Sequence, residues 1–179
     1  MTAQIALLRA VNVAGHGGVA MASLRAFFND LGFAGARTLL QSGNVVFDGD
    51  SGGATLEQRL ESEAAKRLGL RTIFFVRSAA EWEGLIAVNP FPNEAERDPS
   101  HLIVMCLKAT PTKAAVAALQ AAIKGPELVR AGRRHVYITY PAGIGKSRLT
   151  AAVIEKALGS AGTARNWNTV KKLVDLAKR

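Results

Sequence analysis

A glycine-rich turn near the carboxyl end of the chain carries the residues best suited to chemistry. Residues 137–149 read YITYPAGIGKSRL, so that a predicted strand is followed by glycines, cations and a hydroxyl at the start of a predicted helix over 149–158. Unpaired N–H groups and the partial positive charge at a helix start attract anions. The segment is therefore predicted to bind a phosphate or carboxylate, and its candidate ligand contacts are Tyr140, Gly143, Gly145, Lys146, Ser147 and Arg148.

A second polar segment, residues 164–170 (ARNWNTV), adds Arg165 and Asn166 to the candidates. Arg165 has the fork geometry that grips an oxyanion through two hydrogen bonds. Trp167 has two interpretations, a stacking platform for a base or a hydrophobic staple that packs on the core, and the staple is the favoured one.

The glycine turn also has two simpler interpretations. Gly145-Lys146-Ser147 matches the end of a P-loop, but Tyr140 stands where that motif requires a glycine, and the preceding strand belongs to a predicted hairpin. Alternatively, Ser147 simply caps the helix and the glycines simply turn the chain. The sequence leaves this structural role open beside the anion site.

The first half of the chain contributes polar loop residues. Arg9 and Asn12 follow the first predicted strand, at an end where α/β folds commonly place ligands. Gln41 and Asn44, which flank a tight reversal, are further candidates for ligand contacts, and turn formation is the alternative role for both. His16 is the loop histidine that could act as general base if the protein were an enzyme.

Composition narrows the classes of protein. Apolar residues make up 49% of 179, mean hydropathy is +0.12, and no apolar run approaches a membrane span or a signal peptide, so a cytoplasmic protein is expected. Cys106 and the three histidines lack metal-ligand spacing, and the sequence predicts neither a metal nor a cofactor. The oligomeric state is not indicated.

Charge is distributed unevenly along the chain. Residues 124–179 carry 12 lysines and arginines against three acidic residues, whereas residues 1–123 carry 11 of each sign. Such a local positive field attracts anionic partners. The leading hypothesis is a binding module for a phosphorylated small molecule or nucleic acid. The alternatives are an enzyme acting on a phosphorylated or carboxylated metabolite and a protein-interaction domain.

The order of predicted elements indicates an α+β fold. Residues 1–90 show the order βαββαβ, and residues 100–179 show βαββα with a final helix over 169–177. We therefore expect two packed ferredoxin-like subdomains, joined by the acidic linker 94–98. Pro111 is expected to begin a helix. Aligning Val45 with Val136 suggests an internal duplication, and coincidental α/β patterning is the alternative.

Five ordered segments resemble one bacterial family, the domain-of-unknown-function family DUF1697. They are ALLRAVNVAG (6–15), QSGNVVF (41–47), NPF (89–91), YPAGIGKSRL (140–149) and ARNWNTVKKL (164–173). Ala10 and Ala14 stand where the family commonly has glycines. The resemblance implies a two-subdomain α+β fold with ferredoxin-like elements, and it brings no established activity or catalytic residue.

Overall fold

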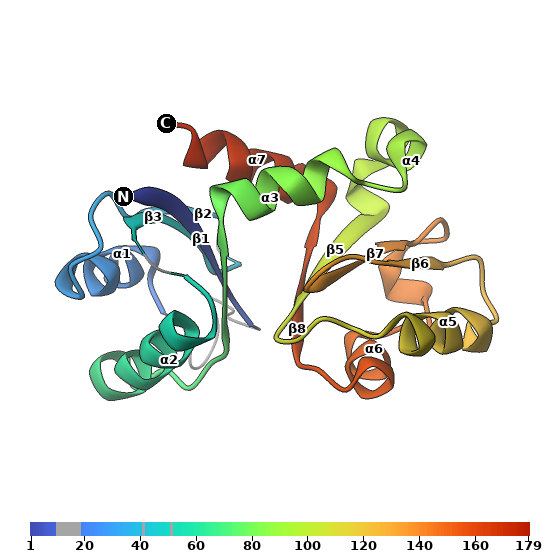
Figure 1. The fold of residues 1–179 in the computed structure, drawn as a ribbon, viewed down its shortest axis with the longest axis horizontal. Helices are drawn as coiled ribbons and strands as arrows, with labels where there is room; N and C mark the ends of the chain where they lie inside the picture. Colours follow the sequence, from blue (N-terminus) through green and yellow to red (C-terminus); the bar gives the residue numbers. More distant parts are fainter. Residues whose placement is uncertain (10–18, 41, 51) are drawn as a thin grey trace. The chain divides into compact units, whose positions relative to one another are not determined.

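The chain divides into two compact units. A computed structural model describes residues 1–9, 19–40, 42–50 and 52–179. The first unit comprises Met1–Gly84 together with Lys172–Arg179, and the second comprises Leu85–Lys171. Each unit holds one four-stranded antiparallel sheet (Figure 1).

The sheet of the first unit has the strand order β2-β3-β1-β4. The elements of this unit are β1 (Thr2–Leu8), α1 (Met21–Asp30), β2 (Arg37–Leu39), β3 (Asn44–Gly49), α2 (Ala54–Leu68) and β4 (Phe74–Ser78). Met21, Leu24, Phe27, Phe28 and Leu31 stand at helical spacing, which predicts a helix over 21–31, and α1 matches it to within one residue. Gly32 follows the helix with φ of 87°, a conformation that favours glycine.

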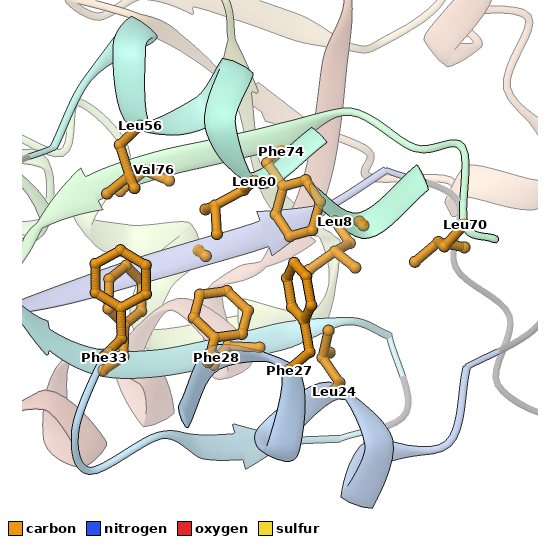
Figure 2. Packing of buried hydrophobic residues seen from close by; sticks show 14 of the residues in the cluster. Leu8, Leu24, Phe27, Phe28, Phe33, Leu56, Leu60, Leu70, Phe74 and Val76 are labelled. Atoms are coloured by element: carbon orange, nitrogen blue, oxygen red, sulfur yellow. The ribbon is translucent and has the colours of Figure 1, made fainter. Parts of the chain in front are cut away.

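An aromatic cluster fills the core of the first unit. Alternation along β3 turns Val45 and Phe47 toward α1 and α2, where they join a cluster of buried side chains from both helices. The Phe28 and Phe47 rings lie 4.8 Å apart, and Phe33 lies 5.0 Å from Phe47. Figure 2 shows labelled members of this cluster, among them Phe28 from α1, Leu60 from α2 and Phe74 from β4, pointing into a common interior. Each such side chain stabilises the fold by roughly 1.5–3 kcal/mol when fully buried.

The sheet of the second unit has the equivalent order β6-β7-β5-β8. Helix α3 (Ala79–Ala87) follows β4, and the elements after it are α4 (Pro92–Arg97), a 3₁₀ turn (Pro99–His101), β5 (Leu102–Leu107), α5 (Lys113–Ala122), β6 (Leu128–Ala131), β7 (His135–Thr139), a 3₁₀ turn (Ile144–Lys146), α6 (Ala151–Leu158), β8 (Gly162–Asn166) and α7 (Trp167–Ala177). The acidic segment 94–98 was expected to be a linker, but most of it lies in α4.

Two sequence predictions for this unit are wrong. No strand is predicted between the second hairpin and the final helix, whereas Gly162–Asn166 form a fourth strand, β8, which pairs with β5 through Met105 and Ala164. Its residues are small or polar, so no hydrophobic alternation signals a strand. Helix α5 begins after Thr112, whose hydroxyl accepts from the Ala115 amide at 3.1 Å, and not at Pro111. Both units therefore have the element order βαββαβ.

The core of the second unit is mainly aliphatic. Helices α5 and α6 lie on the same face of the sheet (Figure 1), and Val116, Leu119 and Ile154 from these helices pack on Met105 and Ile138. Tyr140 is its aromatic member and is almost completely buried. This hydrophobic layer supports the glycine turn that follows β7.

A buried ion pair secures the edge of the first sheet. Glu57 on α2 accepts from the Val76 amide at 2.7 Å and from Arg77 Nη1 at 3.3 Å, and both side chains are at most 5% exposed. Burial removes both charges from water, and leaving one of them without its partner typically costs about 3–5 kcal/mol.

Glu57→Gln tests this pair, because it keeps the shape of the side chain and removes its charge. We expect the free energy of unfolding, measured by urea denaturation, to fall by about 3 kcal/mol. Glu63→Gln is the control on the same helix, since Glu63 pairs with Arg67 at the surface. Equal effects of the two substitutions would contradict a special role for the buried pair.

Candidate functional site

The glycine turn is held by its own side chains. The Tyr140 hydroxyl donates to the Leu149 carbonyl at 2.8 Å and so joins the two ends of the turn. Gly143 has φ of 88°, which disfavours any side chain there. Helix α6 begins at Ala151, and Thr150 caps it by accepting from the Val153 amide at 3.3 Å. The prediction that the helix starts at Leu149, and the alternative that Ser147 caps it, are therefore both wrong.

Three predicted contacts line one cavity of about 570 Å³. Lys146, Ser147 and Arg148 come from the turn, and the loop 124–127 after α5 also lines the cavity. Apolar side chains from α5, α6 and the turn complete the wall, namely Leu119, Ile123, Leu149 and Val153. The cavity thus combines an apolar wall with polar groups near its rim.

A buried carboxylate joins the two sides of this cavity. Glu127 is 7% exposed, and the Ser147 hydroxyl donates to its Oε1 at 2.5 Å. The same hydroxyl oxygen accepts from the Leu149 amide at 3.0 Å. Gln120 Nε2 donates to the Glu127 carbonyl at 3.3 Å. A Cβ at Gly125 would overlap the Glu127 carboxylate, so a side chain at that position would displace the carboxylate. Ser147 is therefore a positioning residue that fixes the turn to the loop.

The charges around the cavity favour an anion. Lys124, Lys146 and Arg148 line it and are exposed, whereas Glu127 is the acidic residue of the lining and is turned toward Ser147. Exposed cations at the rim of a cavity attract anions from solution. A bound anionic group could contact the cations while an attached apolar group lies against the wall.

The remaining C-terminal candidates lie outside this cavity. Arg165 is 8% exposed on β8, and its Nη1 donates at 2.8 Å both to Thr163 Oγ1 and to the Ala164 carbonyl. Burial lowers the pKa of its guanidinium to about 10. Asn166 caps α7 by accepting from the Thr169 amide at 3.0 Å. Tyr140 and Asn166 line a second cavity of about 410 Å³. Gly145 has open space beside its Cα.

The first-half candidates belong to the other unit. Arg9 follows β1, and its carbonyl accepts from the Thr72 hydroxyl at 2.8 Å. Asn44 is fully buried and donates at 2.8 Å to the Leu39 carbonyl and to Ser42 Oγ, as expected of a turn former. Arg9 and Asn44 are not among the residues that line the cavity at the glycine turn.

Asn12, Gln41 and His16 lie outside the residues that the structure describes. Within the described ranges, no helix is both long and apolar enough to cross a membrane. The same ranges contain no group of three or more His, Cys, Asp or Glu side chains that could hold a metal ion.

Sequence reasoning missed three members of the site, Lys124, Gly125 and Glu127. They stand in the loop KGPE (124–127), whose last residue, Glu127, is 12 positions before Thr139, the last residue of β7. A glycine and a proline beside two opposite charges mark a turn. Only the fold brings that turn to Ser147.

Burial of the tyrosines predicts a loss of stability at alkaline pH. Desolvation raises the pKa of both Tyr137 and Tyr140 from 10.0 to about 12, and Glu127 adds to the effect on Tyr140. The unfolded chain ionises first as pH rises above 10, so the free energy of unfolding falls until about pH 12. Tyr140→Phe should make this fall less steep, because it removes one of the two phenols with a raised pKa.

Denaturant unfolding across this pH range measures the effect, and Tyr137→Phe is the matched control. Tyr140→Phe also removes the bond to Leu149, which lowers stability at neutral pH by about 1 kcal/mol. An unchanged alkaline slope in both variants would show that the phenols titrate normally.

Similarity to known proteins extends to a solved structure and to a family model. No curated protein matches the chain. The structure is similar to "the structure of conserved bacterial protein SP0830 from Streptococcus pneumoniae", with a TM-score of 0.78, 21% identity and 98% of each chain covered. At this identity the likeness shows the fold. The family model described as "Protein of unknown function (DUF1697)" matches residues 1–137, which include the first three of the five resembling segments and the loop 124–127. The chain therefore belongs to the DUF1697 family.

Proposed function

We propose that this protein binds a small anionic molecule in the cavity between the glycine turn and the loop 124–127. The observation that supports it is the convergence of Lys124, Lys146 and Arg148 around one cavity of about 570 Å³. These cations are separated in the sequence by up to 24 positions, and the fold brings them to a single concave surface. Ligand sites are typically concave and mostly apolar, with a few polar groups that orient the ligand.

The wall of the cavity indicates what kind of anion it would hold. Leu119, Ile123, Leu149 and Val153 offer an apolar surface beside the cations. A bare inorganic anion would leave that surface unused, whereas a phosphorylated or carboxylated organic molecule would cover it. The cavity therefore favours a metabolite with one anionic group and one apolar part.

A small molecule is favoured over nucleic acid because the aromatic side chains are buried. The seven phenylalanines, two tryptophans and two tyrosines are each at most 8% exposed. Single-stranded nucleic acids are generally bound by stacking bases on accessible aromatic rings. Trp167 is 4% exposed, which supports the staple interpretation. Binding to nucleic acid would have to rely on phosphate contacts alone.

The positive charge of the second unit favours nucleic acid as the second candidate ligand. The second unit has 12 lysines and arginines against five acidic residues, and the first has 11 against nine. A positive surface of this kind binds polyanions without regard to sequence, and such binding weakens steeply with salt. The salt dependence of binding therefore separates the two candidates.

We further infer that both units are ferredoxin-like and arose by duplication. The support is the shared element order βαββαβ together with equivalent orders of antiparallel strands. The Arg77 and Arg165 side chains also make the same contact in the two units, each donating at 2.8 Å to the carbonyl of the preceding residue.

A thermal-shift screen with a matched pair of variants tests the binding proposal. The probes are sugar phosphates, nucleoside monophosphates, aryl carboxylates and short DNA and RNA. We expect at least one small organic anion to raise the melting temperature at moderate salt, and Lys146→Ala/Arg148→Ala to weaken its binding by at least about tenfold.

Lys113→Ala/Lys156→Ala is the control, because it removes the same charge from exposed positions outside the cavity. Equal weakening by the two double variants would mean that only net charge matters. Shifts confined to DNA and RNA that vanish with salt would contradict the small-molecule proposal and support the second candidate.

A further inference from the structure

The two units differ in the side chains that cover the outer edge of their fourth strands. In the first unit, glutamates from α2 accept the outward backbone amides of β4. Glu61 Oε1 accepts from the Phe74 amide at 3.0 Å, and Glu57 Oε1 accepts from the Val76 amide at 2.7 Å. Arg77 Nη1 completes the arrangement by donating to the Val76 carbonyl at 2.8 Å and to Glu57 at 3.3 Å. This edge is thus closed by side chains.

Strand pairing identifies the equivalent positions in the second unit. By their pairing with β1 and with β5, Phe74 on β4 is equivalent to Gly162 on β8, Val76 is equivalent to Ala164, and Arg77 is equivalent to Arg165. Glu155 on α6 accepts from the Gly162 amide at 3.1 Å, just as Glu61 accepts from Phe74. One helical turn before Glu61 stands Glu57, and one turn before Glu155 stands Ala151. Alanine cannot supply the second carboxylate.

A cavity of about 410 Å³ lies where that carboxylate would be. Ala151 and Ala164 both line it, together with Asn166 and the apolar side chains of Ile138 and Ile154. Amides two residues apart on a strand point the same way, so the Ala164 amide points outward like that of Gly162. Ala164 is exposed, and among the residues that the structure describes no acceptor contacts its amide.

We propose that this cavity binds the carboxylate of a small apolar acid, at the place that the Glu57 carboxylate occupies in the first unit. The carboxylate accepts from the Ala164 amide, and the apolar part of the ligand lies against Ile138 and Ile154. The ligand carboxylate thereby pairs the edge amide of the second unit, as Glu57 pairs the equivalent amide of the first unit.

Two further features favour an anion at this place. The first turn of α6 begins at Ala151, and the amides of a helix N-terminus carry a partial positive charge. The Arg165 guanidinium contacts the Ala164 carbonyl at 2.8 Å, as Arg77 contacts the Val76 carbonyl beside Glu57. Burial lowers the pKa of Arg165, and a carboxylate close to it would oppose that effect.

The first test uses hexanoate and its neutral counterpart hexanamide on the ¹⁵N-labelled full chain. Hexanoate should shift the Ala164 amide resonance downfield in a saturable manner and raise the melting temperature by about 2–4 °C at several times its Kd. Hexanamide should do neither. Equal effects of acid and amide, or no effect of either on Ala164, would overturn the proposal.

The second test restores the missing side chain. Ala151→Glu should place a carboxylate on the Ala164 amide, shift its resonance in the absence of ligand and abolish the response to hexanoate. Ala152→Glu is the matched control, because it adds the same charge to the same exposed first turn, at a residue that does not line the cavity. It should keep the hexanoate response. A full response in Ala151→Glu would overturn the proposal.

This site is distinct from the cavity at the glycine turn, although Leu149 lines both cavities. The variant Lys146→Ala/Arg148→Ala changes residues that line only the larger cavity, so its response to hexanoate at Ala164 should equal that of the wild type. Loss of that response would show that hexanoate reports on the larger cavity, and the present proposal would then be wrong.

Discussion

The rest of the structure depends on one constraint, which is that the backbone N–H and C=O groups at the edges of the two sheets need hydrogen-bond partners. A four-stranded open sheet leaves two strands with outward amides and carbonyls, and unpaired groups of this kind are costly when buried and invite aggregation when exposed. The covering helices supply the missing partners. Glu57 and Glu61 bond the edge of β4, and Gln120 bonds the Val129 amide of β6 at 2.8 Å. Packing of the helices is thus coupled to the hydrogen bonding of the sheets.

Hydrogen bonds between side chains and backbone groups also hold the candidate site. Gln120 also bonds the Glu127 carbonyl, which fixes the start of β6, and Ser147 bonds the Glu127 carboxylate. A single chain of contacts therefore leads from α5 through the edge strand to the glycine turn. The cations at the cavity rim occupy defined positions because the backbone beneath them is held by this chain. At β8 the corresponding support comes from Glu155, which accepts from the Gly162 amide, and Ala151, one helical turn earlier, lines the second cavity.

Several elements could be predicted from the sequence because their signals are local. The spacing of Leu24, Phe27 and Phe28 indicates α1, and the turn before Asn44 indicates the β2–β3 hairpin. Strand β8 could not be predicted, because an edge strand of small and polar residues has no hydrophobic alternation. For the same reason, the position of Arg165 within a strand was not predicted. Lys146, Ser147 and Arg148 were found from their types, but their partners Lys124 and Glu127 were not, since these lie about 20 residues earlier.

The sequence by itself determined the family, the α+β class and the position of the glycine turn, because these depend on residue type and on short-range periodicity. The tertiary structure alone decided which charged residues share a cavity and which are buried. Antiparallel pairing brings residues from distant segments together, and burial depends on what covers each face. Lys146 and Arg165 are both cations in polar segments, yet one lines an open cavity and the other is held inside a sheet. Their difference arises from long-range packing that no local pattern records.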